Sequence, residues 1–346
     1  MSQSRIDGLR IAGVSTCLPP RVVDNLDPAL GFDPIDVKKV VSLAGIRQRR
    51  VVEPGVTSGD LCLQAARDLM GALDWDPASV SALIFVSQSP DHWLPSTSCL
   101  LQHRLGLGTH CAAFDVGLGC SGYPYGLYLA ATMLRGGGHQ RVLMLTGETP
   151  SRFISPDDHA TTLLFGDAGS ATALELAPDA PPAFFDLNTD GSGAAGLIIP
   201  GGGFRDRSPA DPRDLLLRMD GAAVFNFTIK RVPELIANTL HFSGLGVSDV
   251  DSFIFHQSNR FMMKHLMTKC GLPAQRVPFT LEELGNCGGP SVPVTLVRSL
   301  PQRRAADLTL LLLGYGVGLS WGATLIKVDP LAVLMERDHA GSGTIA

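Results

Sequence analysis

A cysteine where an apolar run gives way to a glycine-rich turn is the residue of this sequence best suited to chemistry. Cys120 lies in Ala113-Phe114-Asp115-Val116-Gly117-Leu118-Gly119-Cys120-Ser121-Gly122, just before a helical apolar pattern begins. A cysteine in the first turn of a helix feels the positive end of the helix dipole, which favours the thiolate. Such a thiol can also serve only for packing. We expect Cys120 to be reactive near neutral pH.

Two polar residues stand at comparable places further along the chain. His256 ends the apolar segment Phe253-Ile254-Phe255, and Asn286 lies in the glycine-rich turn Leu284-Gly285-Asn286-Cys287-Gly288-Gly289-Pro290-Ser291. Without this context, His256 could be an ordinary core histidine and Asn286 an ordinary turn residue. Together with Cys120 they form a candidate nucleophile with two polar partners.

These segments, with several others, resemble the ketoacyl-acyl-carrier-protein synthase III family of the thiolase-like condensing enzymes. The resemblance covers nearly the whole chain, and its motifs stand in the family's order. It implies a thiolase-like α/β fold, with two similar α/β halves stacked as αβαβα layers. The further segments that carry it are Ala12 to Pro19, Ala44 to Arg50, Phe165-Gly166-Asp167-Ala168-Gly169-Ser170-Ala171, His256-Gln257-Ser258-Asn259 and Gly314 to Gly322.

The resemblance also implies roles for the residues that match the family's motifs. Cys120 would take an acyl group from an acyl thioester, and His256 with Asn286 would support decarboxylative Claisen condensation with a malonyl thioester, carried by an acyl carrier protein. The backbone N–H groups of Cys120 and Val317 would form the oxyanion hole, although the family usually has glycine where Val317 stands. Coenzyme A or phosphopantetheine thioesters would be substrates, and no cofactor or metal is expected.

Two other functions stay open from the sequence. The same cysteine could pass its acyl group to a hydroxyl or amine without decarboxylation, in which case His256 would act as a general base. The chain could also be a non-catalytic subunit of a heteromeric synthase, but the intact set of Cys120, His256 and Asn286 argues against that. Thiolases need a second cysteine in the C-terminal glycine loop, and residues 314–322 contain none.

Basic residues are the candidates for binding coenzyme A or the carrier protein. Lys39 stands where the family typically has the tryptophan that stacks on adenine, and a lysine can pair with phosphate but cannot stack in that way. Arg47 and the pair Arg49-Arg50 are further phosphate candidates. The basic residues Arg260, Lys264 and Lys269, with His265, are spaced to share a helix face that could dock an acidic carrier protein or simply face solvent.

Trp93-Leu94-Pro95-Ser96 resembles the family segment that crosses a dimer interface and lends an acyl-pocket wall to the partner subunit. We therefore expect a homodimer, with Leu94 as a pocket wall. Cys287 stands where the family more often has threonine, and its role is open.

A faint internal duplication divides the chain. The segment Val80 to Ser89 matches Val250 to Asn259, and further pairs follow in the same order. We predict an N-terminal half over residues 1–178 with the cysteine, a C-terminal half over 179–334 with the histidine and asparagine, and a frayed tail over 335–346. Prolines and glycines between Ala177 and Arg213 indicate connecting loops.

Composition narrows the class of protein. A chain of 346 residues that is 45% hydrophobic and 18% charged can bury a sizeable core. Its net charge of −5 gives no case for nucleic acid, and its longest apolar run is too short to span a membrane. Seven cysteines without a disulfide-scaffold spacing or a CxxC pair indicate a reducing cytoplasm.

Overall fold

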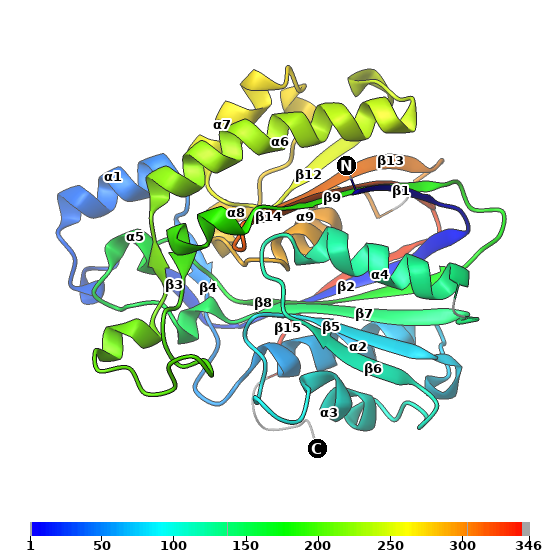
Figure 1. Cartoon of the computed structure of the whole chain (residues 1–346), viewed down its shortest axis with the longest axis horizontal. Helices are drawn as coiled ribbons and strands as arrows, with labels where there is room; N and C mark the ends of the chain where they lie inside the picture. The colour runs from blue at the N-terminus through cyan, green and yellow to red at the C-terminus, as the bar shows by residue number, and fades with distance from the viewer. Residues whose placement is uncertain (1, 137, 303, 341–346) are drawn as a thin grey trace.

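The computed structural model describes residues 2–136, 138–302 and 304–340. Two large sheets alternate with three layers of helices (Figure 1). The five-stranded sheet has the order β1 (Ser2–Ile6), β9 (Ala183–Thr189), β14 (Ser320–Val328), β13 (Leu308–Gly316) and β12 (Ser252–Phe255). The six-stranded sheet has the order β15 (Val333–Asp338), β2 (Leu9–Leu18), β8 (Ala168–Leu176), β7 (Arg141–Glu148), β5 (Ala82–Val86) and β6 (Ala112–Val116).

Helices cover both sheets. Between the sheets lie α4 (Gly122–Gly136) and α9 (Ser291–Ser299), whereas α6 (Gly221–Ser243) and α7 (Arg260–Lys269) cover the outer face of the five-stranded sheet. On the outer face of the six-stranded sheet lie α2 (Ser58–Ala72) and α3 (Thr97–Arg104). The smaller elements are α1 (Pro34–Ala44), α5 (His159–Thr162), α8 (Leu281–Leu284), and the strand pairs β3 (Val22–Asp24) with β4 (Gln48–Arg50) and β10 (Leu197–Ile198) with β11 (Arg218–Met219).

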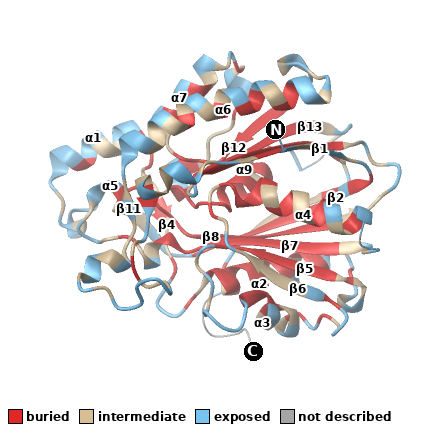
Figure 2. Ribbon diagram, viewed as in Figure 1, coloured by how far each residue is buried: buried red, intermediate tan, exposed pale blue. Residues whose placement is uncertain are grey.

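The apolar core follows these layers. One cluster joins the facing sides of the two sheets to α4 and α9, a second lies beneath α6 and α7, and a third lies beneath α2 and α3. Figure 2 shows buried residues along the central strands, while the outward faces of α1, α6 and α7 are exposed. Strands covered on both faces, such as β13, are apolar without alternation because neither face meets water.

The predicted fold class is confirmed, and the duplication is visible in the strand pairing. The series β5, β7, β8, β2 pairs parallel, antiparallel and antiparallel. The series β12, β13, β14, β9 pairs in the same directions. Each half therefore repeats one α/β unit, and the segments matched in the sequence, which contain β5 and β12, occupy corresponding places.

Three predictions about the boundaries are wrong. Residues 183–189 form β9, a strand inside the five-stranded sheet, although prolines nearby indicated only loops. The predicted tail over 335–346 begins too early, because β15 continues to Asp338 and pairs with β2, and the N–H of His339 donates to Leu18 O; residues 341–346 lie outside the described part. The terminal strands also cross between the halves, since β1 pairs with β9.

Within the described part of the chain, the model contains no helix whose length and apolar character would let it cross a bilayer.

Candidate active site

Cys120 lies in the turn between β6 and α4, where two glycine-containing segments approach it closely. A Cβ atom on Gly316, at the end of β13, would lie 2.8 Å from Cys120 Cβ and 3.0 Å from its Sγ. A Cβ on Gly314 would lie 2.7 Å from Cys120 O. Glycine is thus required where the C-terminal half meets the cysteine, and Gly316 also has a positive φ of 155°.

The charge state of Cys120 differs from the expected thiolate. Burial, followed by the negative charge of Glu148, raises the pKa of Cys120 to about 12, although hydrogen bonds from the backbone N–H groups of Val317 and Cys120 itself act in the opposite direction. The prediction of a thiolate near neutral pH is therefore wrong for the unliganded protein. Loss of hydration outweighs the partial charge at the start of α4. The two N–H groups predicted as an oxyanion hole do both lie beside the sulfur.

His256 follows β12 and is almost fully buried. Its Nδ1 lies 3.0 Å from Gly288 O and 2.8 Å from Ser291 Oγ. When Nδ1 carries the hydrogen it donates to Gly288 O, and Nε2 is an acceptor. Ser291 Oγ donates to Gly288 O at 2.6 Å; if its hydrogen turns to Nδ1 instead, Nε2 becomes a donor. Burial lowers the pKa of His256 to about 4, so the ring is neutral at physiological pH. The two tautomers correspond to a base and to a donor.

The side chain of Asn286 is oriented by its own turn. Its Oδ1 accepts from Gly288 N at 2.9 Å, and its Nδ2 donates to Ser258 O at 3.4 Å. Because the oxygen is occupied and the amide nitrogen has two hydrogens, one N–H is left for a ligand. Asn286 can therefore donate to a developing negative charge, which is the role that the resemblance implies for it.

The turn that carries Asn286 is held from the other half of the protein. Asn286 N donates to Leu164 O, and Gly166 N donates to Asn286 O. Arg49 is only 3% exposed and donates to Asn25 Oδ1 and Phe165 O. The prediction that Arg49 is a phosphate partner is therefore wrong, because its guanidinium lies inside the protein and braces the segment beside Asn286.

Arg50 was also predicted to pair with phosphate, but it lies in a different place from Arg49. It donates to Pro19 O and pairs with Asp338 at 3.0 Å. These bonds anchor β4 to the segment around the last strand, so Arg50 is also taken up by the fold.

Cys120, His256 and Asn286 line one small cavity of about 90 Å³, here called the His256 cavity. Phe165, Leu197, Ser258, Asn259, Met262, Tyr315 and Gly316 are among its other walls. The structure thus brings together the three residues that the sequence selected, from three turns far apart in the chain. A Cβ on Gly289 would lie 2.8 Å from Gly119 O, which shows how closely the Cys120 and Asn286 turns meet.

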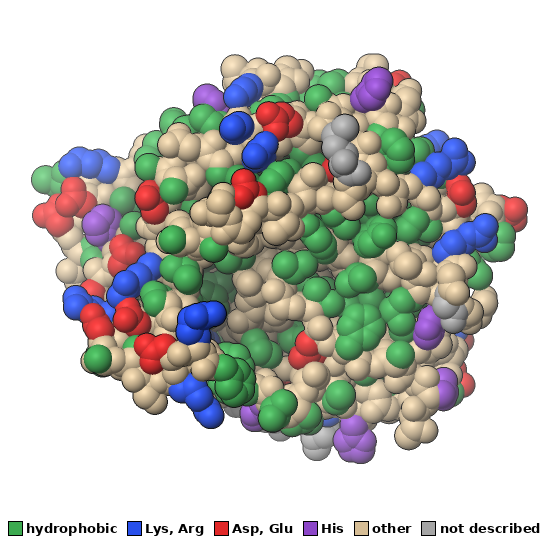
Figure 3. Space-filling model, viewed as in Figure 1, with side chains coloured by type: hydrophobic (Ala, Val, Ile, Leu, Met, Phe, Trp, Pro, Cys, Tyr) green, Lys and Arg blue, Asp and Glu red, His purple; other side chains and the backbone are tan. Residues whose placement is uncertain are grey.

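A larger cavity of about 390 Å³, here called the Gln88 cavity, opens on the other side of Cys120. Figure 3 shows hydrophobic side chains gathered around a hollow on the viewed face. The cavity is lined by Gln88, Gly119, Cys120, Glu148, Pro150, Phe153, Phe165, Ala194, Leu197, Ile198, Ile199, Leu217, Gly288, Val317 and Gly318. Cys120, Phe165 and Leu197 belong to both cavities, so a thioester at Cys120 has a space on each side.

Val317 and Glu148 shape the Gln88 cavity. A Cβ on Gly119 would lie 3.1 Å from Val317 Cγ1, so the valine covers the residue before the cysteine.

Glu148 ends β7 and accepts hydrogen bonds from Gln88 N and Ser89 Oγ, both at 2.8 Å. Burial raises the pKa of Glu148 to about 7. Sequence reasoning missed Gln88 and Glu148, although Gln88 lies in the duplicated segment, as the residue that corresponds to Ser258.

Cys287 faces away from both cavities. It is 1% exposed and packs with Leu18, Ala168, Leu284 and Val294. Burial raises its pKa strongly. These contacts assign Cys287 to packing.

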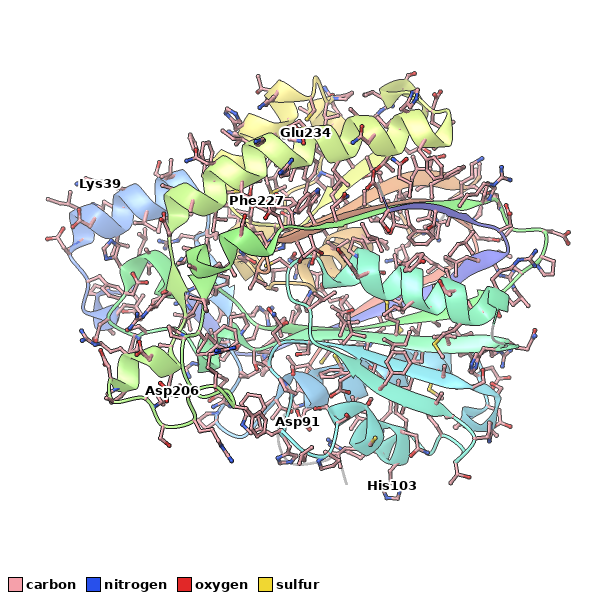
Figure 4. The ribbon with its side chains drawn as sticks, viewed as in Figure 1. Lys39, Asp91, His103, Asp206, Phe227 and Glu234 are labelled. Atoms are coloured by element: carbon pink, nitrogen blue, oxygen red, sulfur yellow. The ribbon has the colours of Figure 1, made fainter. Side chains whose placement is uncertain are left out.

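The basic residues divide into separate groups. Lys39, Arg260 and Lys264 line one surface hollow with Ser42, Leu43 and Phe261, here called the α1–α7 surface. Figure 4 labels Lys39 on α1, at the edge of the molecule. Lys269 lies outside that hollow and donates to Ile229 O. Arg47 pairs with Asp24 at 2.7 Å and lines another hollow beside Glu282 and Arg298.

Leu94 is 84% exposed and does not line either cavity of its own chain. Its neighbour Trp93 is 67% exposed and meets Phe204, which is 75% exposed, edge to face at 6.0 Å. This apolar surface is here called the Trp93 patch.

The fold and the site together define a condensing enzyme of the thiolase-like class. Residues 114–193 match the family model for 3-oxoacyl-[acyl-carrier-protein] synthase III, and residues 240–328 match the model for its C-terminal part. A protein of Campylobacter jejuni, described as a candidate 3-oxoacyl-[acyl-carrier-protein] synthase 3, is 32% identical over 95% of this chain and 96% of its own length.

Solved structures agree with the family models. The 3-oxoacyl-(acyl-carrier protein) synthase of Burkholderia xenovorans is 42% identical, with a TM-score of 0.94 over 97% of this chain and 98% of that chain. The synthase III of Pseudomonas aeruginosa is 28% identical, with a TM-score of 0.82 over 93% of this chain and 98% of that one. The chain belongs to the 3-oxoacyl-[acyl-carrier-protein] synthase III family. It is an acyltransferase of the condensing type.

Proposed function

We propose that Cys120 takes an acyl group from a coenzyme A or carrier-protein thioester and that the acyl group is then condensed with a malonyl thioester. In the first step Sγ bonds to the acyl carbon, the old carbon–sulfur bond breaks, and the thiol proton passes to the departing sulfur. In the second step the malonyl group loses carbon dioxide, and the resulting enolate carbon displaces Cys120 from the acyl group.

The orientation of Asn286 is the observation that carries this proposal. An amide whose oxygen is bonded within its turn presents its remaining N–H to a ligand, and an enolate oxygen is an acceptor. In the donor tautomer, His256 supplies a second hydrogen bond from Nε2. The N–H groups of Cys120 and Val317, which lie beside the sulfur, are available to stabilise the tetrahedral oxyanion when the acyl group arrives or leaves.

The test is direct. Protein preloaded with an acyl group and then given malonyl-carrier protein should release one carbon dioxide for each acyl group lost from Cys120 and form 3-oxoacyl-carrier protein, seen by mass. Transfer of the acyl group to a hydroxyl or amine acceptor, with no carbon dioxide released, would instead support the simple acyltransferase. His256 in its acceptor tautomer favours that second candidate.

The α1–α7 surface is proposed to dock the carrier protein. The helix α7 connects the two regions, because Asn259 before it and Met262 within it line the His256 cavity while Arg260, Phe261 and Lys264 line the surface hollow. Arg260 pairs with Glu282 at 2.8 Å and Lys39 with Asp36 at 3.1 Å, whereas Lys264 makes no ion pair with the described residues. A carrier docked there would bring its phosphopantetheine arm to the side of Cys120 that holds His256 and Asn286.

Removing the two lysines of this surface should therefore weaken carrier-borne substrate selectively. For the double variant Lys39→Ala/Lys264→Ala, we expect the apparent KM for malonyl-carrier protein to rise by about three- to tenfold. This rise should be smaller at high salt, because salt screens the attraction between the surface and the carrier. The KM for a free pantetheine thioester should stay unchanged. Lys327→Ala, at the far end of β14, is the matched control. Equal effects on both substrates would contradict docking at this surface.

The Trp93 patch is proposed to be the contact between two copies of the chain. Exposed aromatic and aliphatic side chains gathered on one surface are typical of such contacts. Light scattering should then give twice the mass of one chain, and Trp93→Glu/Leu94→Glu should give the mass of one. A wild-type monomer at micromolar concentration would be evidence against the dimer. We further propose a cytoplasmic location, supported by seven cysteines that are all unpaired.

A further inference from the structure

The side chain of Gln88 is a polar group that the fold leaves free beside Cys120. Among the described residues that line the Gln88 cavity, only Gln88, Cys120 and Glu148 have polar side chains. Both carboxylate oxygens of Glu148 accept hydrogen bonds, from Gln88 N and from Ser89 Oγ. The carboxamide of Gln88 makes no hydrogen bond with the described part of the chain. It is therefore the one carboxamide in this wall that a ligand could satisfy.

The backbone of Gln88 is fixed by its surroundings, whereas its side chain is exposed. Its backbone N–H is held at 2.8 Å by the buried Glu148, directly after β5 ends. The neighbouring Ser89 Oγ donates to the other Glu148 oxygen and accepts from Thr149 N at 3.0 Å. The carboxamide oxygen of Gln88 then packs against Gly119, where an added Cβ would collide with it. A fixed backbone places this amide next to the residue that precedes the cysteine.

The amide lies on the acyl side of the site and not on the side of the pantetheine arm. Gln88 lines only the Gln88 cavity, whereas His256 and Asn286 line only the His256 cavity. A thioester bonded at Cys120 has its acyl chain and its pantetheine arm in different directions. Since the arm must bring the malonyl group to His256 and Asn286, the acyl chain is left with the Gln88 cavity.

We propose that the preferred acyl groups carry a hydroxyl close to the thioester carbonyl and that Gln88 recognises this hydroxyl. The inference rests on the proposed acylation of Cys120. A plain alkyl chain would displace water from the carboxamide and offer it no partner, which disfavours binding. A hydroxyl both donates and accepts, as a carboxamide does, while the remaining walls, among them Phe153, Ile199 and Val317, suit the hydrocarbon part.

The experiment is a competition between two matched donors. Wild-type protein receives equal concentrations of butanoyl-CoA and 3-hydroxybutanoyl-CoA, and intact mass reports which acyl group Cys120 carries at early times. We expect a preference of about five- to tenfold for the hydroxyacyl group, the value of one neutral hydrogen bond. Gln88→Leu should reverse or remove that preference while loading butanoyl at least as fast. Gln140→Leu, the same change at an exposed residue away from the cavity, should keep the wild-type ratio.

The possible results of this competition separate the inference from the proposed function. No preference in the wild type, or a preference that Gln88→Leu leaves intact, would overturn the inference while leaving acylation of Cys120 standing. An equal loss of both donors in folded Gln88→Leu would also overturn it, because Gln88 would then serve the arm shared by the donors. Failure of the wild type to load any acyl donor would remove the proposed function itself. If Gln88→Leu does not fold, Gln88→Met provides the same comparison.

Discussion

Cys120→Ala should gain no acyl mass from any acyl-CoA or acyl-carrier donor that loads the wild-type protein. The sulfur is the atom that meets both cavities and two backbone N–H groups, so no neighbouring side chain can replace it. Intact-protein mass after incubation with a panel of donors measures the effect, which should be complete loss.

Cys287→Ala is the matched control, because Cys287 is buried in apolar contacts away from both cavities. It should acylate as the wild type does. Acyl mass that persists in Cys120→Ala and disappears in Cys287→Ala would show that Cys287, and not Cys120, is the nucleophile.

The same thiol should show a steep pH dependence in the unliganded protein. With a pKa of about 12, the thiolate is a minor species at neutral pH, and its fraction rises with pH. Iodoacetamide labelling of Cys120, followed by peptide mass, should accelerate about tenfold for each pH unit between about 7 and 10. A plateau near pH 7 would show instead that the thiol is already ionised.

Asn286→Ala should separate acylation from decarboxylation. Loss of the amide removes one donor to the enolate oxygen but leaves Cys120 and its N–H groups in place. We expect Cys120 to acylate at close to the wild-type rate and carbon dioxide release from malonyl-carrier protein to fall by roughly 10²–10³-fold. Single-turnover acylation by mass and radiolabelled carbon dioxide release measure the two steps separately.

His256→Ala should lower carbon dioxide release at least as much. Cys287→Ala again serves as the control, since it alters the same turn as Asn286 without touching the cavity. If Asn286→Ala slows both steps equally, the residue supports the shape of the site and is not a specific donor. If His256→Ala slows acylation most, the acceptor tautomer and a base function fit better.

The part of the site that could be predicted is the part that local patterns specify. Cys120, His256 and Asn286 each follow an apolar strand or lie in a glycine turn, so their segments are recognisable before any tertiary contact is known. The duplication could be recognised for the same reason, because β5 and β12 are short apolar segments in similar surroundings.

What could not be predicted depends on contacts distant in sequence. The pKa of Cys120 is raised by burial where the two halves meet and by the negative charge of Glu148. The segment around Cys120 reveals neither of these causes. Arg49 and Arg50 looked like surface cations, but Asn25 and Asp338 hold them in the fold. Strand β9 was missed because prolines flank it, although its buried Phe185 fits a strand.

The crossing of β1 and β15 between the two sheets makes the folding of each half depend on the other. The edge strand β1 lies before β2 in the chain but pairs with β9, and β15 lies after β14 but pairs with β2. Neither half can complete its sheet as an autonomous unit, and such long-range pairing slows folding. If the chain were divided near residue 178, each fragment would expose an unpaired strand edge, which promotes aggregation. Strands β1 and β15 thus fasten together the two halves between which the catalytic turns lie.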